Sequence, residues 1–80
     1  MTNREKLKNL VMDVFLLAES EFSFDLSRDD MGWDSLGTVA IAVGINDTFG
    51  HHPSPEEATA LRGIPDIISL LVAKGVSFDE

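Results

Sequence analysis

Apolar residues return at helical spacing in four stretches of this 80-residue chain. The first stretch follows Thr2, which together with Glu5 has the S/T-x-x-E spacing of a capping box. Apolar positions then recur at steps of three and four residues, which predicts an amphipathic helix with one buried stripe. Leu16 points away from that stripe. The stripe itself consists of Leu7, Leu10, Val11, Val14, Leu17 and Ala18.

Residues 20–34 interrupt the helical pattern and predict a long polar loop. A loop of this length in a small domain is either anchored by apolar side chains or functional. The next helical pattern covers residues 35–49 and stops at Gly50, a residue type that commonly ends helices. The expected anchors of the loop are Phe22, Phe24, Leu26 and Met31.

Two further helical patterns complete the chain. "SPEE" at 54–57 combines a serine cap, a proline at the first helical position and a glutamate three residues after the cap. It predicts a short helix that ends near residues 61–63. The last helix is expected from about residue 65 to Gly75, with Lys74 at the negative end of its dipole, and the tail "VSFDE" is expected to be loose. The inward-facing residues of this helix are Ile64, Ile67, Ile68 and Leu71.

No alternating strand pattern competes with these helices, so the predicted fold class is all-α. We expect a small four-helix bundle, with three longer helices and a short third helix, forming one domain over residues 1–80. A chain of this size buries only a small core, which argues against a water-excluding catalytic pocket without excluding catalysis.

The helix predicted over residues 35–49 is apolar on two opposite sides. An 80-residue bundle can hardly bury one helix on every side, so one face has a second role. The face that carries Phe49, the largest anchor, is expected to meet the core. The other face either docks a partner or lies under the long loop, and the pattern favours neither. The core face is Thr38, Ile41, Ala42, Ile45 and Phe49; the other is Leu36, Val39, Ala40, Val43 and Asp47.

Charge and composition narrow the classes of partner. The chain has 14 acidic and 6 basic residues, a net charge of −8, so nucleic acids and anionic membranes are not expected partners, whereas basic protein surfaces are. There is no cysteine, which excludes disulfides, thiolate zinc sites and a thiol nucleophile of the chain's own. With no signal peptide and no stretch of about 20 apolar residues, we expect a monomeric, cytoplasmic protein without membrane insertion.

The stretch "MGWDSLG" at 31–37 places Ser35 where a loop gives way to a helix. Serine is a common helix cap, and so is the preceding Asp34. If Asp34 caps the helix, Ser35 becomes the first helical residue and its hydroxyl projects freely at the positive end of the dipole. That position suits an attached phosphate group.

Hydrolytic and metal chemistry are poorly supported by the same stretch. Gly32 and Gly37 give G-x-x-S-x-G rather than the G-x-S-x-G of a nucleophile elbow. His51 and His52 lie beyond the far end of the helix, roughly 20 Å from the serine. Being adjacent, they do not form a metal pair at i, i+4, and "DDMGWD" lacks the order of a calcium loop, so no metal site is expected.

The segment "MGWDSLGTVAIAVGINDTFG" resembles the prosthetic-group region of acyl carrier proteins, "SPEEATAL" resembles their short third helix, and "GIPDIISLLV" their fourth. The resemblance covers residues 4–74. It implies a 4′-phosphopantetheine group on Ser35, transferred from coenzyme A by a phosphopantetheinyl transferase. It also implies a carrier without catalysis of its own, which bears acyl groups as thioesters and presents them to loading, synthase and transferase enzymes of fatty-acid, other lipid or polyketide biosynthesis.

One departure from this family concerns the acidic row expected along the second helix. Uncharged Gly37, Ala40, Asn46 and Thr48 stand at matching positions, and only Asp47 keeps its charge. We therefore expect partner recognition to be more apolar than usual, in a specialised polyketide, peptide-like or unusual lipid pathway. The residues expected to meet partners are Asp34, Leu36, Val39, Ala40, Val43 and Asp47.

Trp33 has two interpretations: a loop anchor, which is the more common role for an aromatic residue here, or a contact for the arm or the transferase. Two alternatives to an acyl carrier also stay open, namely an aminoacyl or peptidyl carrier and an unmodified acidic interaction module in which Ser35 only starts a helix. A cleft for an acyl chain is a further hypothesis, based on four small residues near the second and third helices: Ala40, Ala42, Gly44 and Ala58.

Overall fold

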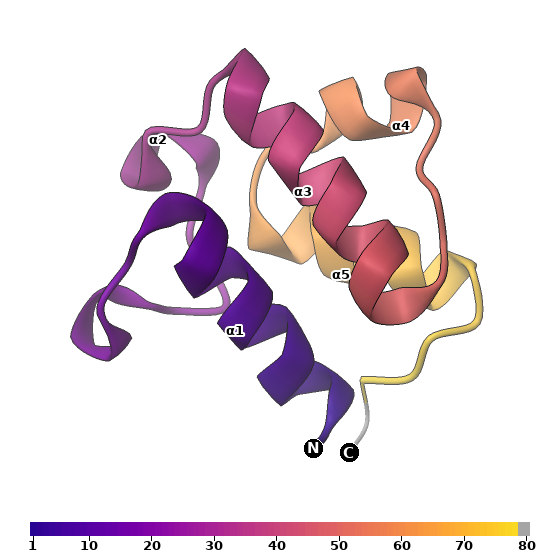
Figure 1. Ribbon diagram of the computed structural model, residues 1–80, viewed down its shortest axis with the longest axis horizontal. Helices are drawn as coiled ribbons and strands as arrows, with labels where there is room; N and C mark the ends of the chain where they lie inside the picture. Colours follow the sequence, from indigo (N-terminus) through magenta and orange to yellow (C-terminus); the bar gives the residue numbers. More distant parts are fainter. Residues whose placement is uncertain (79–80) are drawn as a thin grey trace.

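The computed structural model describes residues 1–78, which form five α-helices and one 3-10 turn. Three of the helices are long, so the predicted all-α fold with three longer helices is confirmed. Figure 1 shows α1 and α3 side by side, with α4 and α5 following α3 along the chain. The elements are α1 Asn3–Phe15, η1 Glu19–Glu21, α2 Arg28–Met31, α3 Ser35–Phe49, α4 Pro55–Ala60 and α5 Ile64–Ala73.

Two predicted capping boxes mark helix starts as expected. Thr2 Oγ1 accepts the backbone N–H of Glu5 at 3.1 Å, while the Glu5 carboxylate accepts the backbone N–H of Thr2 at 3.3 Å. Ser54 and Glu57 repeat the arrangement at α4, with distances of 3.1 and 2.9 Å. The hydrogen bond from the Thr2 backbone lowers the pKa of Glu5, and that from the Ser54 backbone lowers the pKa of Glu57. Both helices therefore start where the sequence predicts.

The expectation of an uninterrupted loop over residues 20–34 is wrong. This segment contains α2, a single helical turn, and the last two residues of η1. Asp30 accepts hydrogen bonds from the backbone N–H and the hydroxyl of Ser27, both at 3.0 Å, so a cap of S-x-x-D spacing starts α2. Gly32, with φ +65°, ends it. The expected anchors are confirmed, because Met31 is buried and Phe22, Phe24 and Leu26 are packed against the core.

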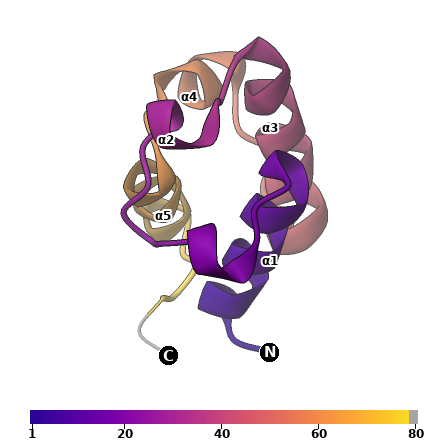
Figure 2. The same cartoon turned by 90° about the vertical axis from the view of Figure 1, so that its left-hand side faces the viewer.

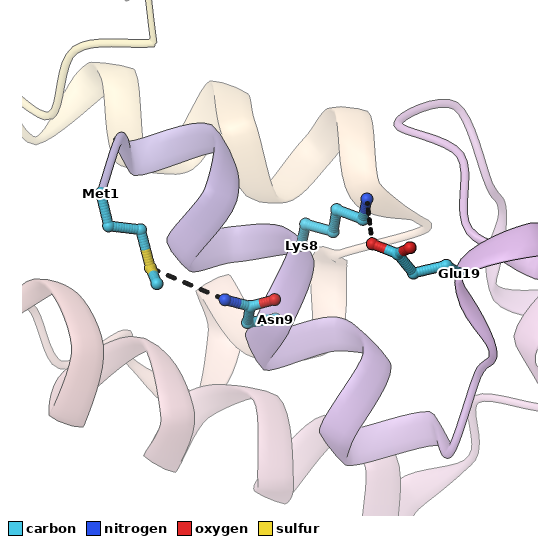
Figure 3. A network of polar contacts seen from close by, with 4 residues as sticks. All are labelled: Met1, Lys8, Asn9 and Glu19. Atoms are coloured by element: carbon cyan, nitrogen blue, oxygen red, sulfur yellow. Dashed lines mark hydrogen bonds and ion pairs between the residues drawn. The ribbon is translucent and has the colours of Figure 1, made fainter.

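The segment that follows α1 is held against that helix by side-chain contacts of Lys8. Lys8 Nζ lies 3.1 Å from the Glu19 carboxylate, as Figure 3 shows, and 5.8 Å from the ring centroid of Phe22. In the same figure, the Asn9 amide donates to the sulfur of Met1 at 3.6 Å. α1 thereby fixes the start of the segment that leads to α2 and on to α3.

The core lies between the α1–α3 pair on one side and α5 with the short helices on the other (Figure 2). Ile68, which the sequence places inward, is only half-buried. The small size of the core limits the stability that burial supplies. Its fully buried side chains are Leu7, Val11, Ile41, Ile45, Ile64, Ile67 and Leu71.

Two glycines let α1 and α3 approach closely. A Cβ on Gly37 would lie 2.8 Å from the Phe15 ring and 3.2 Å from the Trp33 ring, and a Cβ on Gly44 would overlap the Leu10 side chain. These glycines weaken α3 as a helix by about 1 kcal/mol each. A side chain at either position would require the Phe15 and Trp33 rings or the Leu10 side chain to move.

The expected loose tail is wrong as far as Phe78. Phe78 is only 4% exposed, and its ring centroid lies 6.1 Å from that of Phe49. Its carbonyl accepts a hydrogen bond from Arg4 Nε at 2.8 Å. Gly75, with φ +93°, ends α5 and lets the chain turn back to the core. Residues 79–80 of the predicted tail lie outside the described residues.

Within residues 1–78, no helix has both the length and the apolar character that crossing a bilayer requires.

Candidate functional site

At the start of α3, Asp34 caps the helix, and the hydroxyl of Ser35 takes no part in capping. Asp34 has an extended backbone, and its Oδ1 accepts the backbone N–H of Gly37 at 3.0 Å. Ser35 is the first helical residue and is exposed. No hydrogen bond within residues 1–78 engages the Ser35 hydroxyl. The hydroxyl therefore projects from an end of α3 where amide groups and the helix dipole favour an anion.

A hollow of about 280 Å³ adjoins this hydroxyl. We call it the Ser35 hollow; it is lined by Arg28, Ser35, Thr38, Val39 and Thr59. It brings together residues from α2, α3 and α4, so the serine is not isolated on a helix tip. Arg28 and Thr59 could not be predicted as neighbours of Ser35 from the sequence, because both lie outside the 31–37 stretch that carries the serine. The contacts depend on where α2 and α4 pack.

Trp33 contacts two of the residues that line the Ser35 hollow, Arg28 and Thr38. It is only 6% exposed, its Nε1–H donates to Thr38 Oγ1 at 2.8 Å, and its ring centroid lies 5.3 Å from that of Phe15. The Arg28 guanidinium lies 5.6 Å from the centroid of the Trp33 indole. These contacts support the loop-anchor interpretation of Trp33.

A second concavity of about 300 Å³ continues from the Ser35 hollow along α3. We call it the α3/α4 groove; it shares Thr38, Val39 and Thr59 with the hollow. Its apolar lining comes from both helices and from the segment that joins them. The apolar lining residues are Val39, Ala42, Val43, Pro53, Pro55 and Ala58.

The four small residues on which the cleft hypothesis is based lie on different surfaces. Ala42 and Ala58 do line the α3/α4 groove. Ala40 lines a separate hollow of about 330 Å³ between the end of α1 and the start of α3. Gly44 packs against Leu10 of α1. Ala40 and Gly44 do not line the groove, because the helical rotation places them on the α1 side of α3.

The second apolar face of α3 is open to solvent. Leu36, Val39 and Val43 are 79%, 62% and 52% exposed. Ala40 and Asp47 are exposed as well. The alternative in which the long loop covers this face is therefore wrong. The loop instead packs toward α1 and α5, and leaves an aliphatic strip beginning directly beside Ser35.

Hydrolytic chemistry has no geometric support around this serine. Ser35 and His51 lie at opposite ends of α3, whose 15 residues span about 22 Å. Within residues 1–78, no group of three histidine or acidic side chains is placed to hold a metal ion. The arrangement is instead an exposed hydroxyl, a dipole that favours an anion, one nearby cation and an apolar groove.

Comparison of the sequence with known proteins identifies a family for this chain. The family model described as "phosphopantetheine attachment site" matches residues 5–71. An acyl carrier protein from Syntrophus aciditrophicus (strain SB) is 30% identical over 80 residues, which covers 99% of this chain and 100% of the relative. An acyl carrier protein from Coprothermobacter proteolyticus is 25% identical over 68 residues, 84% of this chain and 83% of the relative. The chain therefore belongs to the acyl carrier proteins, the family whose prosthetic group is phosphopantetheine.

Proposed function

We propose that this protein carries acyl intermediates as thioesters on a 4′-phosphopantetheine arm attached to Ser35, and presents them to biosynthetic enzymes. The observation that supports this proposal most directly lies at the start of α3. Asp34 caps the helix by accepting the backbone N–H of Gly37, and the Ser35 hydroxyl stays exposed. When bound, the arm supplies the thiol that the cysteine-free chain lacks. The protein acts as a carrier and not as an enzyme.

The residues around Ser35 fit such an arm. The phosphate would lie near the first-turn amides of α3, where the helix dipole stabilises negative charge. Ser35 lies at the surface, so a transferase can reach its hydroxyl without unfolding the bundle. The Ser35 hollow provides space beside the attachment atom.

The exposed face of α3 is the proposed contact surface for partner enzymes. It presents Leu36, Val39, Ala40 and Val43, with Asp34 at one end and Asp47 near the other. Apolar contact area supplies affinity in such an interface, whereas charges mainly set the encounter rate. We therefore propose that a phosphopantetheinyl transferase and acyl-loading, synthase and transferase enzymes dock here with apolar surfaces. This favours a specialised polyketide, peptide-like or unusual lipid pathway.

The α3/α4 groove is the proposed shelter for the acyl chain. It is continuous with the Ser35 hollow through Thr38, Val39 and Thr59, and most of its lining is apolar. An acyl chain lying there would bury apolar area at about 25 cal/mol per Å². Acylation should then shift the NMR signals of Ala42 and Ala58, and shifts confined to the outer surface of α3 would contradict the proposal.

Attachment is tested by intact mass after incubation with coenzyme A and a broad-specificity phosphopantetheinyl transferase. We expect the wild type to gain one phosphopantetheinyl group and Ser35→Ala to gain none. Ser69→Ala, which changes an exposed serine on α5, is the matched control and should load as the wild type does. A wild type that gains no mass would support the unmodified acidic interaction module.

The kind of cargo needs a separate measurement. Loading assays with acyl and aminoacyl donors, each with its activating enzyme, distinguish an acyl carrier from an aminoacyl or peptidyl carrier. We expect acyl loading, because most of the groove lining is apolar and no aspartate, glutamate, lysine or arginine lines it. Turnover of a generic ester, which is not expected, would indicate a hydrolase instead.

A further inference from the structure

Arg28 is the one charged residue among the five that line the Ser35 hollow. It stands at the first position of α2, a single helical turn whose next two residues are both aspartates. The other hollow beside the start of α3 differs in sign, because Asp34 is its only charged lining residue. The two sides of Ser35 are thus electrically unlike, with a cation on the α4 side and a carboxylate on the α1 side.

The backbone of Arg28 is held firmly in place. Its N–H donates to the carbonyl of Arg62 at 2.8 Å, and its own carbonyl accepts the N–H of Trp33 at 3.0 Å. The N–H of Gly32 donates to the same carbonyl. Three backbone hydrogen bonds therefore fix the position from which the side chain extends.

The guanidinium of Arg28 is oriented but not neutralised. It lies over the Trp33 ring, which is itself held by a hydrogen bond to Thr38. The ion pairs within residues 1–78 join Lys8 to Glu19 and Lys74 to Glu57, so no carboxylate there lies within 4.0 Å of Arg28.

Two of the neighbouring carboxylates, Asp30 and Asp34, have other partners, and the exposed Asp29 forms no ion pair with Arg28. Asp30 is engaged by Ser27, whose hydrogen bonds lower the pKa of Asp30 and keep it ionised. Asp34 accepts the amide of Gly37. These acids repel a phosphodiester on Ser35, and a nearby guanidinium offsets that repulsion. Its planar fork matches two phosphate oxygens, which a lysine ammonium does not.

We propose that Arg28 binds the phosphodiester of the arm on Ser35, and so directs the arm into the Ser35 hollow and toward the α3/α4 groove. Arg28 is a positioning residue: it selects one of the two sides of α3 by charge. The inference rests on attachment at Ser35, so loading is measured separately from the effect of Arg28.

The test compares the apo and loaded forms of wild type, Arg28→Gln and Arg28→Lys, each driven to complete loading as verified by intact mass. Arg62→Gln removes an exposed arginine that does not line the hollow and serves as the control. Three readouts are followed: the ³¹P chemical shift, the emission of Trp33, which is the only tryptophan in the chain, and the melting temperature.

We expect loading to change the fluorescence emission of Trp33 in the wild type and in Arg62→Gln. The reason is that the Arg28 guanidinium, which lies over the indole, shifts toward the phosphate. Loading should also raise the melting temperature by about 2–5 °C. Both effects should be lost in Arg28→Gln and reduced in Arg28→Lys. In the loaded wild type, the ³¹P shift should move with salt concentration as the pair is screened.

The outcomes separate the two proposals. If no protein gains mass, attachment at Ser35 fails and the role of Arg28 fails with it. If every variant loads, and Arg28→Gln keeps the wild-type ³¹P shift, emission change and melting difference, attachment stands and the role of Arg28 is refuted. Should Arg28→Gln not fold, Arg28→Lys and the salt titration of the wild type decide the question.

Discussion

Gly63→Ala should destabilise the protein severely, because Gly63 lies against the backbone of the segment that precedes α2. A Cβ at this position would be 2.5 Å from the carbonyl oxygen of Leu26 and 3.0 Å from the Cα of Ser27. The backbone φ of 168° is extended, so alanine can adopt it without strain. The penalty therefore comes from the contact alone, and backbone atoms cannot swing aside as a side chain can.

The size of this loss in free energy of unfolding can be worked out from the contacts between the segment at Leu26–Arg28 and the segment at Arg62–Ile64, which the added Cβ would push apart. Two hydrogen bonds hold the segments together, from the N–H of Arg28 to the carbonyl of Arg62 at 2.8 Å and from the N–H of Ile64 to the carbonyl of Leu26 at 3.0 Å. Each is worth about 1 kcal/mol, and overpacking adds about 1–3 kcal/mol. The lower entropy of unfolded alanine returns about 0.4–1 kcal/mol. The expected net loss is about 2–5 kcal/mol, or roughly 10–35 °C in melting temperature for a chain of this size.

Urea unfolding followed by circular dichroism at 222 nm measures this loss. Gly50→Ala is the matched control: its φ is +73° and no atom lies within 4 Å of the added Cβ, so it bears only the left-handed strain of about 1 kcal/mol. If Gly63→Ala loses no more free energy of unfolding than Gly50→Ala, the close backbone approach does not exist in the molecule and the reasoning is refuted.

Three further substitutions test separate parts of the structure. Leu16→Gly should stabilise by about 0.5–1 kcal/mol in thermal unfolding, because Leu16 has φ +54° and is 87% exposed; unchanged stability would contradict left-handed strain there. The pKa of Glu57 is lowered by its bonds from Ser54, so it contributes stability above its unfolded pKa that is lost as the pH falls through the lower folded value. Glu57→Gln, which removes the titrating carboxyl, should flatten that part of the stability–pH curve below pH 4.5, whereas an unaltered curve would exclude the link. Val39→Asp should lower kcat/KM of the transferase by about 5–30-fold with stability unchanged, and Val72→Asp, equally exposed on α5, should not; equal effects would argue against docking on α3.

The helices other than α2 could be predicted from the sequence because their signals are local. Periodicity and caps lie within each helix, as at Thr2 and Ser54, and the glycine at position 50 ends α3 by its own conformational freedom. The α2 turn has only four residues, too few for a period to be visible. Its one local signal was the spacing of Ser27 and Asp30, in which an aspartate replaces the usual glutamate.

The other features that the sequence did not predict depend on contacts between segments that are distant along the chain. The burial of Phe78 requires the ring of Phe49 and the side chain of Arg4, which are far from it in sequence. Whether the second face of α3 is covered depends on where the loop packs, and no residue of α3 encodes that. The serine and its cap could be predicted from Asp34 and Ser35 alone, whereas the approach of Arg28 to Ser35 requires the bundle to be assembled.

The position of Arg28 depends on packing outside α2, because one helical turn has almost no stability of its own. The bridge between Ser27 and Gly63 holds the start of α2, and the burial of Met31 and Trp33 holds its end. Loaded Gly63→Ala, studied well below its melting temperature, should therefore lose the salt-dependent ³¹P shift even though Arg28 and Ser35 are both present. If the shift persists in the folded variant, the guanidinium reaches the phosphate without the bridge. The charge beside the attachment site would then come from a freely moving side chain, and not from one that the bundle holds in place.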